Sequence, residues 1–227
     1  MNVLHICANP KPTEDSASKQ LATAFFGKMI EINPDIEILN VDLYADPPPF
    51  LSYEMIRGFW YPITISGYTA TKEETNAMEY ATNQSRVFNT ADVLVLTLPM
   101  WNYTIPGILK AWMDQILTPG STFTISKEEG VKPLHRIRKL VMLVSSGGVY
   151  KEGDPRDALT TQVEQIFSWI GIDDIGIAWA DGQDEALDFD SVEHKEVAKE
   201  AALELAEEVA ELSLIHISEP TRPRLIS

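Results

Sequence analysis

The sequence predicts an α/β protein in which a parallel sheet of five strands lies between two layers of helices, a three-layer α/β/α sandwich. Three observations predict it. Apolar runs typical of strands alternate with amphipathic stretches of helical spacing, in the order βαβαβαβαβα. Residues 92–98 and 139–144 are apolar almost throughout, as parallel strands covered on both faces are. The chain has 227 residues and 44% hydrophobic content, enough to fill such a core.

The first strand and helix are the clearest elements of the N-terminal part. Residues 2–7 form a short apolar run that ends at an Asn-Pro-Lys-Pro loop signal. Residues 16–33 form a helix, which Ser16 or Asp15 would cap and which Asn33-Pro34 would end. Its expected inward stripe consists of Leu21, Phe25, Met29 and Ile32.

A second strand at residues 36–41 leads into a segment that fits no simple element. Residues 46–70 contain Pro47, Pro48 and Pro49, which exclude regular structure there. The segment is nevertheless too rich in aromatic residues to be a disordered linker. We therefore expect a long ordered excursion at 46–70, followed by a polar helix at 71–89 and the strand at 92–98.

The C-terminal half continues the alternation. We expect helices at 106–117, along the stripe 159–170 and at 191–211, and strands at 139–144 and 175–180. In the last helix the residues expected to face inward are Val197, Ala201, Leu205 and Val209. We interpret residues 1–211 as a single domain. Residues 212–227 break the helical pattern and resemble translated vector sequence, so we expect a non-native or disordered tail.

Composition excludes several classes of function. The chain has 34 acidic and 18 basic residues and a formal charge of −16, which argues against nucleic acid and against an anionic membrane surface as partners. The single cysteine, Cys7, excludes a disulfide framework and a multi-cysteine zinc site, and no other pattern indicates a metal. No apolar stretch approaches the roughly 20 residues of a membrane helix. We expect a cytoplasmic protein.

Three loops carry the residues that suggest a ligand, and all three follow strands whose carboxyl ends meet at one edge of the sheet. The loop at 8–18 is rich in serine and opens a helix, which suits either an anion or ordinary helix capping. It lacks glycine, so it is neither a dinucleotide fingerprint nor a P-loop. The loop at 99–106 offers two flat aromatic rings and an amide, and the loop at 145–150 offers a Ser-Ser-Gly-Gly turn that lets backbone N–H groups approach a planar ligand.

Four motifs resemble those of the FMN-dependent NADH:quinone oxidoreductase (azoreductase) family. They are Ser-Ala-Ser-Lys-Gln-Leu at 16–21, Pro-Met-Trp-Asn-Tyr at 99–103, Gly-Ser-Thr-Phe at 120–123 and Ser-Ser-Gly-Gly-Val-Tyr at 145–150. The resemblance extends over residues 1–211 and implies a flavodoxin-like sandwich. It also implies a homodimer that binds FMN at the interface between its chains.

The resemblance also implies roles for individual residues. Ser16, Ala17 and Ser18 would hold the FMN phosphate, with Asn9 near it. The flavin ring would be lined by Met100, Trp101, Asn102 and Tyr103, and its polar edge would meet Ser145, Ser146, Gly147 and Gly148. Phe123 and Tyr150 would border the pocket in which nicotinamide and acceptor bind in turn. Asn9 stands where many members have serine, and Ser146 where many have arginine.

The implied activity is the two-electron reduction of quinones, and of azo compounds, by NADH or NADPH through ping-pong hydride transfer. FMN carries this chemistry, so no catalytic side chain is expected. The alternative is a flavodoxin-type electron-transfer protein that does not itself oxidise NADH, which the acidic composition suits. A Rossmann dehydrogenase is disfavoured because the G-x-G-x-x-G motif is missing.

Overall fold

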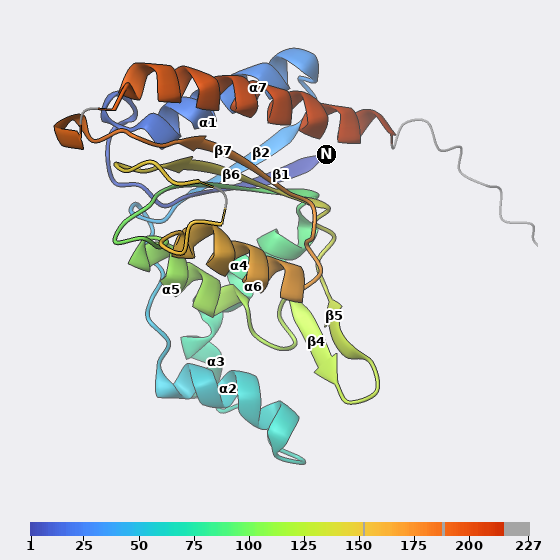
Figure 1. Cartoon of the computed structure of the whole chain (residues 1–227). Helices are drawn as coiled ribbons and strands as arrows, with labels where there is room; N and C mark the ends of the chain where they lie inside the picture. Colours follow the sequence, from blue (N-terminus) through green and yellow to red (C-terminus); the bar gives the residue numbers. More distant parts are fainter. Residues whose placement is uncertain (152, 188, 216–227) are drawn as a thin grey trace, which may run out of the picture.

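A parallel five-stranded sheet forms the centre of the molecule, in the order β2–β1–β3–β6–β7 (Figure 1). This computed structural model describes residues 1–151, 153–187 and 189–215. The strands of the sheet are β1 (Asn2–Cys7), β2 (Glu37–Asp42), β3 (Val93–Pro99), β6 (Lys139–Ser145) and β7 (Ile175–Ala180). All five predicted strands are confirmed, and the order is that of flavodoxin-like proteins, with its switch point between β1 and β3.

Helices cover both faces of the sheet, as the alternation predicts. One layer consists of α1 (Ala17–Ile32) and α7 (Ser191–Ile215), and the opposite layer of α4 (Glu79–Thr90), α5 (Gly107–Ile116) and α6 (Ala158–Trp169) (Figure 1). Every residue of β3 is buried, because its odd and even side chains face different helical layers. Parallel pairing brings the carboxyl ends of β1, β3, β6 and β7 to the same edge of the sandwich.

The excursion at 46–70 contains a helix that the sequence analysis did not predict. Helix α2 (Tyr53–Thr64) follows the three prolines and packs on the short helix α3 (Lys72–Ala77). The polar helix predicted at 71–89 is thus divided into α3 and α4, with Met78 between them. In Figure 1, α2 and α3 extend beyond the layer formed by α4, α5 and α6.

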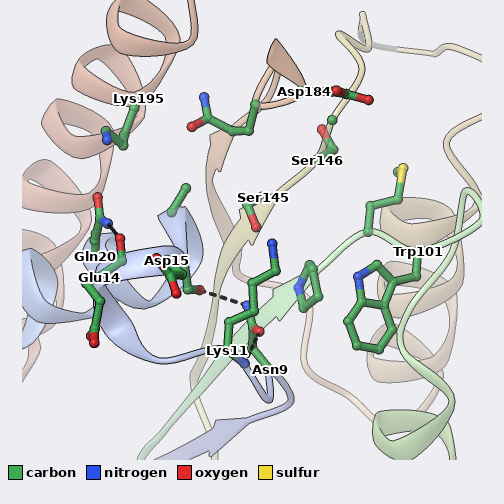
Figure 2. Close-up of a pocket in the computed structure, with 16 residues that line it drawn as sticks. Asn9, Lys11, Glu14, Asp15, Gln20, Trp101, Ser145, Ser146, Asp184 and Lys195 are labelled. Carbon is green, nitrogen blue, oxygen red and sulfur yellow. Dashed lines mark hydrogen bonds between the residues drawn. The ribbon is translucent and has the colours of Figure 1, made fainter. Parts of the chain in front are cut away.

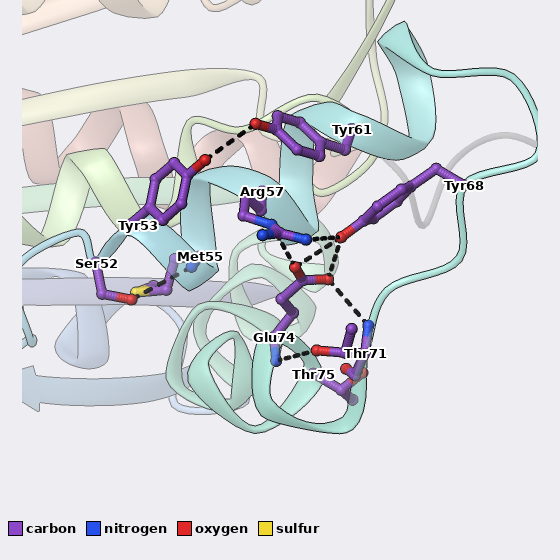
Figure 3. A network of polar contacts seen from close by, with 9 residues as sticks. All are labelled: Ser52, Tyr53, Met55, Arg57, Tyr61, Tyr68, Thr71, Glu74 and Thr75. Atoms are coloured by element: carbon purple, nitrogen blue, oxygen red, sulfur yellow. Dashed lines mark hydrogen bonds and ion pairs between the residues drawn. The ribbon is translucent and has the colours of Figure 1, made fainter.

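A buried polar network fixes α2 against α3 (Figure 3). The Glu74 side chain is 3% exposed and forms an ion pair with the Arg57 guanidinium at 2.8 Å. Its carboxylate also accepts hydrogen bonds from the Tyr68 hydroxyl at 2.6 Å and from the Thr71 N–H at 2.9 Å. These hydrogen bonds lower the pKa of Glu74, with the charge of Arg57 as a further cause. The network gives the excursion a defined shape although little of it is in the main core.

An antiparallel hairpin, β4 (Phe123–Ser126) and β5 (Gly130–Pro133), was also not predicted. Its strands are short and mostly exposed, so they lack the apolar runs that identified the central strands. Phe123 is the exception, at 1% exposed, and its ring lies 4.7 Å from that of Trp169. The hairpin projects from the same side of the sandwich as α2 (Figure 1).

Helix α7 differs from the prediction in its buried face and in its end. Val197 is 61% exposed, whereas the buried positions are Ala198, Ala202, Ala206, Val209 and Ala210. These small side chains let α7 lie close to the sheet, and an added Cβ at Gly176 would meet Leu205 at 2.4 Å. The helix continues to Ile215, past its predicted end at Glu211, and Leu212 packs on the core. The rest of the predicted tail, residues 216–227, lies outside the described residues. In α1, Ile32 is 38% exposed rather than inward.

Candidate functional site

A cleft of about 600 Å³ opens at the carboxyl edge of the sheet, between the loops that follow β1, β3, β6 and β7 (Figure 2). Its volume is typical of a small-molecule or cofactor site. The cleft brings together most of the predicted cofactor-binding residues: Asn9, Ser16, Ala17, Met100, Trp101, Ser145, Ser146 and Gly147. These residues come from three loops that are far apart in the sequence, so the parallel topology alone assembles the site.

The first wall is a hydrogen-bonded serine turn at the start of α1. The Asn9 side chain, in a residue only 2% exposed, donates from Nδ2 to Ser16 Oγ at 2.8 Å and to Ser18 Oγ at 3.1 Å. Ser16 Oγ also accepts the N–H of Lys19 at 3.2 Å and so caps the helix. Both lone pairs of the Ser16 hydroxyl are therefore used, which leaves its hydrogen to donate either to Ser18 Oγ, 3.3 Å away, or to a ligand in the cleft.

Further donors and a positive charge surround the same turn. The N–H groups of Ala17 and Ser18 make no hydrogen bond within the described residues, as is usual in the first turn of a helix. Lys11 forms no ion pair with any described residue, and its side chain points into the cleft (Figure 2). Free N–H groups, a donating hydroxyl and an ammonium group together suit a phosphate. Lys11 thus adds a positive charge to the serine-rich loop that the sequence singled out.

The second wall is a tight turn after β3. The N–H and C=O groups of Trp101 and Thr104 bond to each other at 3.0 and 3.1 Å, and the residues between them, Asn102 and Tyr103, have φ values of 50° and 69°. Two successive non-glycine residues with positive φ are rare outside such turns and store strain. The turn places Trp101 in the cleft, 39% exposed, and leaves Asn102 and Tyr103 outside its lining.

The third wall is the Ser-Ser-Gly-Gly turn after β6. Ser145, Ser146 and Gly147 line the cleft, whereas Gly148 does not. Gly148 lies against Tyr150, since an added Cβ would be 3.4 Å from the Tyr150 hydroxyl. The Tyr150 ring in turn stacks on Trp179, with centroids 5.6 Å apart, and burial raises the pKa of Tyr150.

Several predicted residues lie next to the cleft rather than in it. Ser18 is fully buried behind Asn9, and Phe123 belongs to the core under the β4–β5 hairpin. The structure therefore does not bring Phe123 and Tyr150 together with the other predicted residues in the lining of this chain's cleft. Phe123 is too deeply buried to border an open pocket formed by one chain.

The sequence analysis missed half of the lining residues. They are Lys11, Glu14, Asp15, Gln20, Pro99, Gln183, Asp184 and Lys195. Gln183 and Asp184 lie in the loop after β7, which has no recognisable motif, whereas Glu14, Asp15 and Gln20 lie in or next to the serine-rich loop. Lys195 lies on a helix that its many acidic residues identified as a solvent-exposed surface. Only the position of Lys11, inside the serine-rich loop, could have predicted a charged group near an anion.

The remaining reactive side chains near this edge are structural. His5 is 9% exposed, and its ring nitrogens pair with Asn40 Oδ1 and Thr97 Oγ1, both at 2.8 Å. Burial lowers its pKa. Cys7 is 8% exposed beneath the serine turn, and burial raises the pKa of its thiol. Among the described residues, no group of three or more His, Cys, Asp and Glu side chains could hold a metal ion, and no helix is long and apolar enough to cross a membrane.

Fold and cleft together define a flavodoxin-like protein with a serine-rich turn at the β1/β3 switch point. A family profile described as "Flavodoxin-like fold" matches residues 1–207. An FMN-dependent NADH:quinone oxidoreductase of Gluconobacter oxydans is 32% identical over 80% of this chain and 89% of its own length. One of Brevibacillus brevis is 30% identical over 90% and 98%. The chain belongs to the family of FMN-dependent NADH:quinone oxidoreductases.

Solved structures agree with this assignment. An azoreductase from Bacillus anthracis superimposes with a TM-score of 0.81 at 28% identity, over 92% of this chain and 99% of the other. A second protein of that species, an FMN-dependent NADH-azoreductase in complex with FMN, gives a TM-score of 0.80 at 26% identity over the same shares. The flavodoxin-like sandwich predicted from the sequence is thereby confirmed.

Proposed function

We propose that this protein binds FMN in the cleft and uses NADH or NADPH to reduce quinones by two electrons, and azo compounds reductively. The observation that carries the proposal is the serine turn, where a hydroxyl with both lone pairs occupied, the unbonded N–H group of Ala17 and the Lys11 side chain line the same cleft. That donor set fits the phosphate of FMN. The names of the relatives, FMN-dependent NADH:quinone oxidoreductase and azoreductase, support the same cofactor and reaction.

The residues of the cleft divide into groups with different tasks. Ser16 and the N–H groups of Ala17 and Ser18 would bind the phosphate, and Asn9 would orient the serine hydroxyls. Met100 and Trp101 would flank the ring system, because they are the apolar side chains of the lining apart from Ala17 and Pro99. Ser145 and the turn that follows would meet its polar edge. FMN supplies the two-electron chemistry when bound, and the protein supplies binding, orientation and electrostatics.

The test of this function is the identity of the cofactor and its direct reduction. Protein purified after reconstitution should release FMN, identified by its mass, and stopped-flow mixing with NADH or NADPH alone should bleach the flavin absorbance. A flavodoxin-type carrier would keep its absorbance until a separate reductase is added. Release of FAD, or no flavin after reconstitution, would refute the proposal itself.

We further propose that the active unit is a homodimer in which each flavin site needs both chains. Tyr53, Ile56, Trp60 and Ile63 are spaced along one side of α2 and are 61%, 41%, 43% and 49% exposed, and Phe50 beside them is 85% exposed. We call these five residues the α2 surface. The opposite side of α2 buries Met55 and Phe59, whereas the α2 surface stays exposed, and the partners of Tyr53, namely Tyr61 and Arg57, belong to α2 itself. A second copy would cover this apolar area, which a monomer rarely leaves open.

The dimer can be tested by charging the α2 surface. The double variant Phe50→Glu/Trp60→Glu should sediment as a monomer at low micromolar concentration, where the wild type is a dimer, and should lose NADH–quinone activity. Val197→Glu is the matched control, because Val197 is also exposed, at 61%, but lies on α7. A monomeric wild type with full activity would contradict the shared site.

The proposed location is the cytoplasm, which the single buried free thiol supports.

A further inference from the structure

Three of the four carbonyl groups of the Ser-Ser-Gly-Gly turn after β6 are fixed by the β7 loop, and the fourth, that of Ser145, accepts the N–H of Met100 at 2.7 Å. The carbonyl of Ser146 accepts the N–H of Gln183 at 2.9 Å. The carbonyls of Gly147 and Gly148 accept the N–H groups of Asp184 and Gly182 at 3.2 and 3.1 Å. Three successive carbonyls are therefore occupied by one neighbouring segment. Gly182 has a φ of 62°, and an added Cβ would lie 3.1 Å from Phe189, so this segment is itself closely constrained.

The Ser146 side chain is used entirely inside the protein. Its hydroxyl accepts a hydrogen bond from Trp179 Nε1 at 2.8 Å and donates to the Gly148 carbonyl at 2.9 Å. The residue is 5% exposed. The hydroxyl hydrogen is thus unavailable to a ligand, although Ser146 contributes to the wall of the cleft. The Ser146 hydroxyl donates to the turn itself, at the Gly148 carbonyl, and the hydrogen bond from Trp179 Nε1 fixes the direction of that hydroxyl.

The N–H groups of the same turn have the opposite arrangement. Neither Gly147 nor Gly148 donates its N–H to any described residue, and Gly147 lines the cleft. With the carbonyls fixed on one side, the turn offers hydrogen-bond donors on the other. Donors that are fixed in advance stabilise negative charge more than donors that must reorient.

We propose that Trp179 is a positioning residue that acts through Ser146 to hold the backbone of this turn with its free N–H groups toward the cleft, and that these donors favour the reduced, electron-rich form of the bound flavin although the Asp184 carboxylate lies beside Gly147. The inference rests on the proposed function, since it takes FMN as the ligand. Trp179 itself lies on β7, and the Tyr150 ring stacks on it at an interplanar angle of 19°. It therefore acts from outside the lining of the cleft.

Trp179→Phe tests the inference, because phenylalanine keeps a ring for Tyr150 to stack on and removes only the indole N–H. Ser146→Ala removes the same hydrogen bond from the other side, together with the hydrogen bond from the Ser146 hydroxyl to the Gly148 carbonyl. Each variant should weaken reduced FMN about tenfold more than oxidised FMN, which corresponds to a two-electron midpoint potential about 30 mV more negative. The double variant should show the same shift as Ser146→Ala alone, because the indole N–H acts through the Ser146 hydroxyl, which is already absent there. Trp169→Phe, on α6, is the control and should leave the potential unchanged.

The readouts are the midpoint potential and the FMN affinity by titration, with circular dichroism to verify the fold. A wild-type protein that binds no flavin would refute the proposed function and with it this ligand. A wild type that binds FMN, with an unchanged potential in folded Trp179→Phe and Ser146→Ala, would refute the inference alone. Additive shifts in the double variant would also overturn it, because Trp179 would then not act through Ser146.

Discussion

Ser16→Glu is expected to abolish FMN binding, with an affinity loss of at least about 100-fold. The substitution places a carboxylate in the part of the cleft that Ser16, Ala17 and Lys11 line. That carboxylate would accept hydrogen bonds from the donors proposed to bind the phosphate, and its negative charge would repel the phosphate. Two charges about 4 Å apart interact by about 4 kcal/mol near a protein surface. Fluorescence titration with FMN measures the loss.

Riboflavin, which lacks the phosphate, separates this effect from general damage to the cleft. Its affinity should change far less than that of FMN in Ser16→Glu. Ser16→Ala is the uncharged control and loses the cap of α1, which costs about 1 kcal/mol of stability, with a smaller loss of FMN affinity. Equal losses for riboflavin and FMN would mean that the phosphate does not lie at the serine turn.

Trp112→Ala should destabilise the protein by about 3–5 kcal/mol, because a fully buried indole leaves a cavity that the neighbours cannot fill. Trp112 lies on α5, is 0% exposed and donates from Nε1 to Gln84 Oε1 at 3.1 Å. For a chain of this size the melting temperature should fall by about 6–20 °C. Thermal unfolding followed by circular dichroism tests the expectation.

Trp101→Ala is the matched control for this experiment. The same side chain is removed from a position that is 39% exposed in the cleft, so the melting temperature of the flavin-free protein should change by less than about 2–4 °C, or about 1 kcal/mol. Its FMN affinity should fall instead. A similar loss of stability in both variants would contradict the assignment of Trp112 to the core and of Trp101 to the cleft.

The strands were predictable because a strand that is buried on both faces is apolar at nearly every position of its sequence. β3 and β6 have uninterrupted apolar runs, and their order along the chain with the intervening helices sufficed to predict the sheet. Helix α2 left no such mark. Apolar residues occupy both its inner and its outer side, and Pro62 lies inside it, so neither periodicity nor composition indicated a helix.

Helix α7 shows why hydrophobicity alone assigns a buried face incorrectly. Its contact with the sheet and α1 is made largely by alanines, which contribute little to an apolar stripe in the sequence, whereas the larger Val197 lies in solvent. Close approach of backbones favours small side chains, and a pattern based on residue size favours large ones. The distance between the backbone of α7 and those of its neighbours decides which of the two kinds of residue is buried, and a pattern of residue sizes does not contain that distance.

The loops that form the candidate site could be predicted from the sequence, but the individual side-chain contacts within it could not. The position of the cleft follows from strand order, so the three loops were correctly brought together. Which side chains reach the cleft depends on local geometry. The left-handed pair Asn102 and Tyr103 turns two predicted residues outward, and the contribution of Gln183 and Asp184 depends on hydrogen bonds to the Ser-Ser-Gly-Gly turn. The roles of the predicted residues in binding FMN remain predictions until affinities are measured.

The burial of Cys7 affects whether quinone substrates can react covalently with the protein. Quinones are electrophiles that form covalent adducts with thiolates, and a turnover cycle exposes the protein to them repeatedly. Cys7 is the single cysteine of the chain, is 8% exposed, and has a pKa that burial raises. A shielded thiol that stays protonated is a poor nucleophile. The one thiol of the chain is therefore a poor target for arylation by a quinone.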